Sequence, residues 1–185
     1  MDLEFRTVPA ELRHWATTDP DTPAFIFVDA AGGRCVLTRA DLFRLSSRYA
    51  AMLRQWGVQA GHTVCNTLPN SPERLLTDLG VLLAGGVAMN GQLFLADGDD
   101  FVGSLKDAAC FAVILDPRQP KGAARVLEKR KHTQHGSEVR YWVCRTGSSR
   151  QSCCVALGVR SGVMDQWFLC ELSYSSESGV RRHDL

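Results

Sequence analysis

Residues 57–90, GVQAGHTVCNTLPNSPERLLTDLGVLLAGGVAMN, predict a strand, a helix and a second strand, and this order decides the fold. The β-forming run 64–68 is followed by Pro69-Asn70-Ser71-Pro72-Glu73, in which a serine cap and a proline at the first helical position start a helix. Leucines at spacings of three and four then form one apolar stripe, and Gly85-Gly86 ends the helix. A strand–helix–strand unit of this kind predicts parallel strands and a right-handed crossover.

The same stretch carries a resemblance to a known superfamily. The segments 57–61 (GVQAG), 68–73 (LPNSPE) and 83–87 (LAGGV) are similar to the N-terminal part of adenylate-forming enzymes. That superfamily comprises AMP-dependent acyl-CoA synthetases and ligases, luciferases and peptide-synthetase adenylation domains. The resemblance covers about residues 10–130 and is strongest to acyl-CoA synthetases. It implies, for a full-length member, a carboxylic acid substrate, ATP, Mg²⁺ and CoA, and a role such as fatty acid metabolism.

Upstream of this stretch the sequence predicts a helix, a hairpin and a longer helix. Residues 9–16 are a short helix by pattern, and 24–29 and 35–37 are strands separated by a Gly32-Gly33 turn. Thr38, with Asp41 three residues on, has the spacing of a helix-starting cap. Apolar side chains recur with a helical period over 39–56, and Gly57 follows as the expected C-terminal cap.

Downstream, the pattern predicts a helix over 98–108 and a strand over 110–115 (CFAVIL), whose continuous apolar run is typical of a strand covered on both faces. Strands near 63–67, 87–90 and 111–115 alternate with helices. The predicted fold class is therefore α/β, with a partial doubly wound parallel sheet, a small N-terminal β-hairpin and a poorly ordered C-terminal tail.

The C-terminal tail lacks the alternation of strands and helices that the sequence before it predicts. Residues 120–130 can form one more helix, but beyond 131 no sustained period follows, and 139–144 and 167–172 could be isolated strands without a partner. We expect 1–130 to be a truncated N-terminal subdomain and 131–185 a divergent or disordered tail. Truncation, alternative splicing or a mis-predicted gene end would explain the change, and a divergent extension is the alternative.

Charge and composition argue against several classes of protein. A net charge of +1 over 185 residues argues against a general nucleic-acid or membrane-surface binder, and no apolar run is long enough to span a membrane. Residues 1–5 (MDLEF) lack the apolar core of a secretory signal. Seven cysteines without a paired framework favour free thiols in a reducing compartment, so we expect a cytoplasmic protein.

Adenylate formation needs a phosphate loop, which the resembled enzymes supply as a Ser/Thr/Gly-rich run ending in Pro-Lys-Gly. This chain has Pro120-Lys121-Gly122, but residues 116–119 (DPRQ) before it contain neither glycine nor hydroxyl and cannot form a nest of backbone amides. The cluster 146–149 (TGSS) is not followed by Pro-Lys-Gly. We therefore assign no catalytic or cofactor-binding residue and expect no adenylation by this chain alone.

Metal and thiol chemistry have weak candidates. A set of histidine and cysteine side chains in the tail could bind zinc, but the spacing of these residues lacks a compact ligand pair. That set is His132, His135, Cys144, Cys153 and Cys154. A second set, Asp97, Asp99 and Asp100, could bind Mg²⁺ or simply start a helix. No metal ligand is assigned.

The remaining cysteines, Cys35, Cys65 and Cys110, lie in or beside predicted strands and are expected to be buried apolar residues. His62 is the one candidate base close to a cysteine in sequence. It stands where the resembled enzymes often have aspartate in a structural turn, which puts the turn geometry in doubt rather than catalysis.

Two surface hypotheses concern partners. The arginines at 39, 44, 48 and 54 lie off the apolar stripe of their helix and form either a basic docking face or a solvated outer face. An incomplete sheet would leave an exposed edge and an uncovered apolar face. The alternative function is therefore a non-catalytic interaction module that dimerises or pairs with a full-length paralogue. A third hypothesis is an unrelated flavodoxin-like binding domain.

Overall fold

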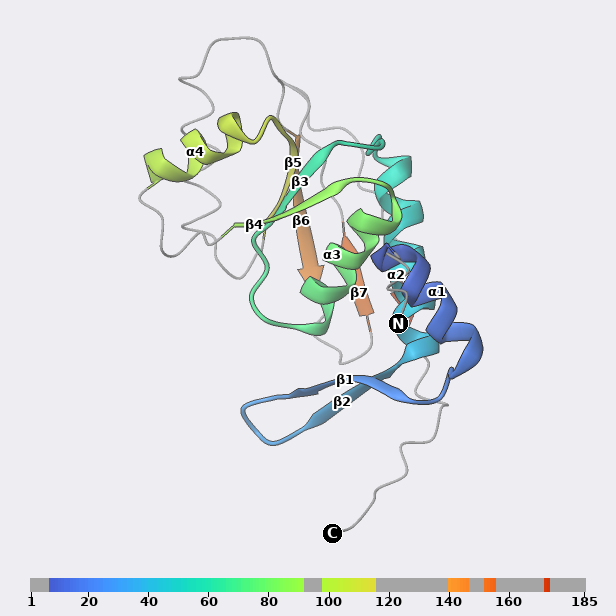
Figure 1. The fold of residues 1–185 in the computed structure, drawn as a ribbon. Coiled ribbons are helices and arrows are strands. Elements are labelled where there is room, and N and C mark those ends of the chain that lie inside the picture. Colours follow the sequence, from blue (N-terminus) through green and yellow to red (C-terminus); the bar gives the residue numbers. More distant parts are fainter. Residues whose placement is uncertain (1–6, 92–97, 116–139, 147–151, 156–171, 174–185) are drawn as a thin grey trace, which may run out of the picture.

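The computed structural model describes residues 7–91, 98–115, 140–146, 152–155 and 172–173 (Figure 1). The helices are α1 (Val8–Thr18), α2 (Arg39–Gln55), α3 (Pro72–Leu83) and α4 (Gly98–Asp107). The strands are β1 (Pro23–Val28), β2 (Arg34–Thr38), β3 (Thr63–Asn66), β4 (Val87–Asn90), β5 (Cys110–Leu115), β6 (Arg140–Thr146), β7 (Ser152–Val155) and β8 (Leu172–Ser173). None of the described helices combines the length and the apolar character needed to cross a membrane.

The main sheet has the strand order β4-β3-β5-β6-β7-β8, with β3 between β4 and β5. The β3–β4, β3–β5 and β5–β6 pairs are parallel, whereas β7 and β8 join in antiparallel pairs. The chain therefore leaves β3 to one side, forms β4, and returns across β3 to form β5. This reversal confirms the α/β class and the three predicted strands of the doubly wound sheet.

The predicted helix signals are confirmed at the atomic level. The Oγ1 atom of Thr38 accepts a hydrogen bond from the backbone N–H of Asp41 at 3.1 Å, and the Oγ atom of Ser71 accepts one from the N–H of Arg74 at 3.2 Å. Gly57 follows α2 with a φ of 92°, a left-handed conformation that costs glycine little. The two long helices begin and end where these residues predict, within two residues.

The sheet has a helical layer on each face. Figure 1 shows α1, α2 and α3 gathered on one side of the strands and α4 on the other. Val64 belongs to the core cluster that includes α1, α2 and α3. Its neighbour Cys65 points to the opposite face, where its sulfur and the ring of Phe101 from α4 both lie near Gly91. Successive residues of β3 thus serve two separate cores.

One prediction about the tail was wrong. The strand expected at 139–144 was expected to lack a partner, but β6 pairs with β5 in parallel, from Ala112 opposite Arg140 to Leu115 opposite Val143. Parallel pairing joins segments that are distant in the chain and leaves no turn between them to detect. The strand expected at 167–172 falls mostly outside the described residues, although Leu172 begins β8. The helix expected at 120–130 and the boundary expected at 130 lie outside the described residues.

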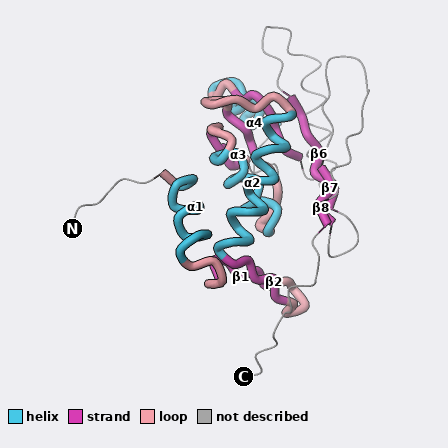
Figure 2. The backbone as a smooth tube through the Cα atoms, turned by 90° about the vertical axis from the view of Figure 1, so that its right-hand side faces the viewer, coloured by secondary structure: helices cyan, strands magenta, loops and turns pink. Residues whose placement is uncertain are grey.

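The hairpin β1–β2 is separate from the main sheet. Its antiparallel register places Ile26 opposite Val36 and Val28 opposite Arg34. Figure 2, seen at right angles to Figure 1, shows the hairpin at the end of α2 from which that helix begins. The predicted hairpin is confirmed: β1 is shifted by one residue from the expected range and β2 is longer by one residue at each end.

Candidate functional site

The carboxyl ends of β3 and β5 meet where the strand order reverses, and ligands of open α/β sheets bind at this kind of position. Thr67 joins the two ends. Its backbone N–H and its Oγ1 atom both donate to the carbonyl oxygen of Ile114, at 3.0 and 2.7 Å. This is the candidate site, and its polar residues follow β3 directly.

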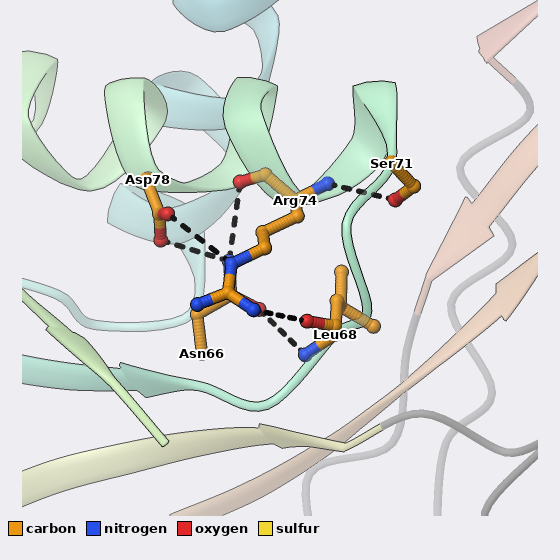
Figure 3. A network of polar contacts seen from close by, with 5 residues as sticks. All are labelled: Asn66, Leu68, Ser71, Arg74 and Asp78. Carbon is orange, nitrogen blue, oxygen red and sulfur yellow. Dashed lines mark hydrogen bonds and ion pairs between the residues drawn. The ribbon is translucent and has the colours of Figure 1, made fainter. Parts of the chain in front are cut away.

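Asn66, the last residue of β3, is fully buried and organises the loop that leads to α3. Its Nδ2 atom donates to Oδ1 of Asp78 at 2.8 Å and to the carbonyl oxygen of Arg74 at 3.2 Å. Its Oδ1 atom accepts from the N–H of Leu68 at 3.1 Å. One buried amide therefore joins the strand, the loop and the helix (Figure 3).

Arg74 closes the same loop from the helix side. Its Nη1 atom donates to the carbonyl oxygen of Leu68 at 2.8 Å, and its Nε atom lies 4.0 Å from Oδ2 of Asp78. Figure 3 shows the guanidinium turned inward, toward Leu68 and Asn66. The positive charge is engaged by groups of the protein itself, so it serves to hold the loop rather than to attract an anion.

Asp78 is the titratable group of this network. Burial raises the pKa of its carboxyl above the ordinary value, and the hydrogen bond from Asn66 and the charge of Arg74 oppose that shift. The Asn66–Arg74–Asp78 network is therefore a satisfied structural device that fixes the carboxyl edge of β3.

Gly91 packs closely against the carboxyl end of β3. A Cβ atom built on Gly91, which follows β4, would lie 2.6 Å from Sγ of Cys65 and 2.9 Å from the ring of Phe101. The N–H of Gly91 donates to the carbonyl oxygen of Asn66 at 2.9 Å. Only glycine fits where the chain leaves β4 across the end of β3.

The three cysteines of the described core do not have the properties of nucleophiles. Burial raises the pKa of Cys65 to about 12, and it raises those of Cys110 and Cys35 as well. A thiolate is the reactive form, so these side chains are protonated at neutral pH. Cys65 and Cys110 are buried, in agreement with the prediction, whereas Cys35 is only partly buried against the core, so the prediction was wrong for that residue.

His62 closes the turn before β3. The Nδ1 atom of its ring accepts a hydrogen bond from the backbone N–H of Gln59 at 3.2 Å. The backbone N–H of His62 donates to the carbonyl oxygen of Gln59 at 3.1 Å. Its ring stacks on Phe111 with 4.1 Å between centroids. The turn therefore forms with histidine in this position, and its side chain takes part in it.

Three of the four arginines weighed as a docking face have partners within the protein. Arg39 pairs with Asp19, and Arg44 pairs with Asp41 at 2.8 Å. Arg54 donates to the carbonyl oxygen of Leu83 at the end of α3. These contacts favour the interpretation as an ordinary outer face that also ties α2 to its neighbours.

Other sequence candidates lie beyond the described side chains. They are Pro120-Lys121-Gly122, the residues 147–149, His132, His135, the three cysteines of β6 and β7, and the cluster Asp97, Asp99 and Asp100. Among the described residues, no group of three or more His, Cys, Asp or Glu side chains could hold a metal ion. Sequence reasoning missed the Asn66–Arg74–Asp78 network, although an asparagine ending an apolar strand was a signal for it.

A family model described as AMP-binding enzyme matches residues 12–153. The chain belongs to the AMP-binding enzyme family. The match continues past residue 130, where the resemblance was expected to end, and includes β6. The hypothesis of an unrelated flavodoxin-like domain was therefore wrong.

Relatives of this AMP-binding chain are acyl-CoA-forming ligases. It is 34% identical over 123 residues to acetyl-coenzyme A synthetase 2 of Zygosaccharomyces bailii, and the match covers 64% of the chain and 17% of that relative. It is 37% identical over 76 residues to 4-coumarate–CoA ligase 4 of Arabidopsis thaliana, covering 41% of the chain and 13% of the ligase. The acyl-CoA synthetase of Brucella canis has the same fold, with a TM-score of 0.58 at 20% identity over 73% of this chain and 23% of that one. The AMP-binding chain thus spans less than a quarter of these proteins and corresponds to an N-terminal portion of such a ligase.

Proposed function

We propose that this chain forms the N-terminal sheet of a carboxylate–CoA ligase and that its role there is to position, not to react. The family match over residues 12–153 is the observation that carries this proposal. Relatives named acetyl-coenzyme A synthetase support a small carboxylic acid as the substrate of the whole enzyme, with ATP, Mg²⁺ and CoA as its other reactants.

The Asn66–Arg74–Asp78 network supports the positioning role. Its hydrogen bonds lock the loop from β3 to α3 at the reversal of the strand order, the edge where such sheets present ligand-binding loops. Adenylate transfer depends on positioning and on neutralising charge, so a rigid edge is the contribution that a scaffold makes.

We further propose that the 185-residue chain alone does not form acyl-adenylates. Residues 116–119 before its Pro-Lys-Gly supply neither glycine nor hydroxyl, and the guanidinium of Arg74 is engaged within the protein. The test is ATP–pyrophosphate exchange with acetate and a panel of fatty and aryl acids, with the Z. bailii acetyl-coenzyme A synthetase 2 as a positive control. We expect no exchange above background, and carboxylate-dependent exchange by the purified chain would overturn this proposal.

An interaction module is the second candidate function, as a homodimer or as a partner of a full-length paralogue. The exposed apolar side chains of the β1–β2 hairpin favour it. Light scattering coupled to size-exclusion chromatography would give the mass of a dimer if two copies associate and that of a monomer if they do not. A role in fatty acid metabolism and a cytoplasmic location stay predictions of the sequence.

A further inference from the structure

The pairing of β5 with β3 contains an irregularity near its beginning. Thr63 of β3 lies opposite Cys110. The next residue of β3, Val64, lies opposite Ala112 rather than Phe111. Phe111 is therefore an extra residue on β5, as in a β-bulge. Because side chains of a strand alternate between the faces of a sheet, each residue of β5 after the bulge points to the face opposite the one that it would otherwise take.

The bulge decides which core each residue of β5 joins. The ring of Phe111 stacks on His62 and packs against the core cluster, to which Ala112 itself belongs. Val113 is fully buried outside that cluster and lies opposite Cys65, on the face that α4 covers. Two consecutive residues thus point toward α1, α2 and α3, and the alternation starts again after them.

The register also decides what meets at the carboxyl end of β5. Ile114 lies opposite Asn66, and its carbonyl oxygen accepts both hydrogen bonds from Thr67. Without the bulge, β5 would slip by one residue, about 3.3 Å along the strand, and a different carbonyl oxygen would reach Thr67. The edge that carries the candidate site therefore depends on an irregularity at the other end of the strand.

Hydrophobic burial by itself chooses poorly between these two registers. All six residues of β5 (CFAVIL) are apolar and are buried wholly or in part. A strand that slips by one residue exchanges its two faces, and here both faces would stay apolar. A specific polar contact at the bulge can therefore decide the register.

The thiol of Cys110 makes such a contact. Its Sγ atom donates to the carbonyl oxygen of Ala112 at 3.0 Å and lies 3.6 Å from the carbonyl oxygen of Thr63, across the bulge. Burial raises the pKa of this thiol, so it keeps the proton that it donates. A bulge disrupts the ladder of backbone hydrogen bonds, and a thiol is a weak donor for a carbonyl oxygen at that point.

We propose that Cys110 is a positioning residue: its thiol holds the bulge and so sets the register that brings the carbonyl oxygen of Ile114 to Thr67. The importance of this edge rests on the proposed function, whereas the register itself does not. Cys110 acts through the backbone of β5, from one end of the strand to the other.

Native-state hydrogen exchange on the 185-residue chain, followed by NMR, tests the proposal. The reporting amide is that of Thr67, which opens when β3 and β5 separate. The reference amide is that of Val58, which donates to the carbonyl oxygen of Leu53 at 3.0 Å after α2 and reports on global unfolding. Dividing the exchange rate at Thr67 by that at Val58 separates a local change of register from a general loss of stability.

Four variants are compared with the wild type. Cys110→Ala and Cys110→Val both remove the donor, and the valine variant does so without leaving a cavity. Cys110→Ser restores a donor in the same position. The matched control is Cys65→Ala, which removes another buried thiol from the neighbouring strand.

We expect the exchange-rate ratio to rise at least about tenfold in C110A and C110V and to stay within about threefold of the wild type in C110S and C65A. If C110A does not fold, C110V carries the same test. An unchanged ratio in the donor-free variants would overturn the proposal, and so would equal acceleration at both amides, which indicates global destabilisation alone. A rise in C110S or C65A as large as that in C110V would overturn it too. ATP–pyrophosphate exchange reports on chemistry and hydrogen exchange on register, so either proposal can fail without the other.

Discussion

Gly80 of α3 lies so close to Tyr49 of α2 that a Cβ atom built on Gly80 would be 2.6 Å from the Cβ of Tyr49. The backbone nitrogen of Ala50 would be 3.2 Å away. Neither neighbour is the flexible end of a side chain. Helices α2 and α3 therefore cross at a point where only glycine fits.

Replacing Gly80 with alanine should destabilise the protein. Alanine gains about 1 kcal/mol of helix propensity over glycine. Forcing a methyl group into a packed crossing costs about 1 to 3 kcal/mol, so we expect a net loss of stability of up to about 2 kcal/mol. Urea unfolding measures this loss. The matched control is Gly103→Ala in α4, where a Cβ would meet nothing within 4 Å and stability should stay equal or rise. A G80A variant as stable as G103A would contradict the close crossing.

Removing the buried amide of Asn66 should destabilise the protein more than the small size of the side chain indicates. Asn66→Ala removes three hydrogen bonds and leaves the N–H of Leu68 without its acceptor. Leaving buried polar groups unpaired costs about 1 to 3 kcal/mol each, so we expect a loss of at least about 2 kcal/mol in the free energy of unfolding. Asn90→Ala is the control, because Asn90 lies opposite Asn66 in the parallel register and is exposed. Similar losses in both variants would refute the role given to the amide.

The raised pKa of Asp78 makes stability depend on pH. The native carboxyl holds its proton to a higher pH than the unfolded one. The contribution of Asp78 is therefore fully present below the ordinary pKa and falls as pH rises through the native pKa. Asp78→Asn removes this titration. We expect the stability of D78N relative to wild type to increase between about pH 4 and about pH 7, as measured by urea unfolding. A relative stability that stays constant or decreases over this range would show that the carboxylate is favoured in the fold.

Cys65 should resist alkylation in the native protein. A pKa of about 12 in place of 9.0 leaves roughly a thousandfold less thiolate at mildly alkaline pH, and burial excludes the reagent as well. Iodoacetamide labelling followed by peptide mass spectrometry, with and without urea, measures the rate at this residue separately from the other cysteines. Labelling of Cys65 at similar rates in both conditions would exclude the buried, protonated thiol.

Local signals made much of the fold predictable from sequence. Ser71 and Thr38 cap the helices that their spacing indicated, and Gly57 ends α2 in a left-handed conformation. Each of these signals acts within one helical turn. The pairing of β6 with β5 was not predictable in this way, because the parallel partners Ala112 and Arg140 are joined by a long connection rather than by a turn.

The candidate site was harder to predict for the same reason. Asn66 and Asp78 meet across twelve positions of the chain, and only the return of α3 along β3 brings them together. An isolated asparagine in an apolar strand signals a buried hydrogen-bond network but does not identify its partners. The family resemblance identified the segments of this region without assigning roles to these residues.

The central place of β3 in the strand order has a consequence for biosynthesis. Thr63 pairs with Val87 on one edge and with Cys110 on the other, and Cys110 follows Thr63 by 47 residues. During translation, β3 and β4 can join as soon as α3 has formed, while the second edge of β3 waits for β5 to leave the ribosome. An open strand edge is a template for pairing with other chains. The nascent protein is therefore most exposed to aggregation in the interval between the synthesis of β4 and that of β5.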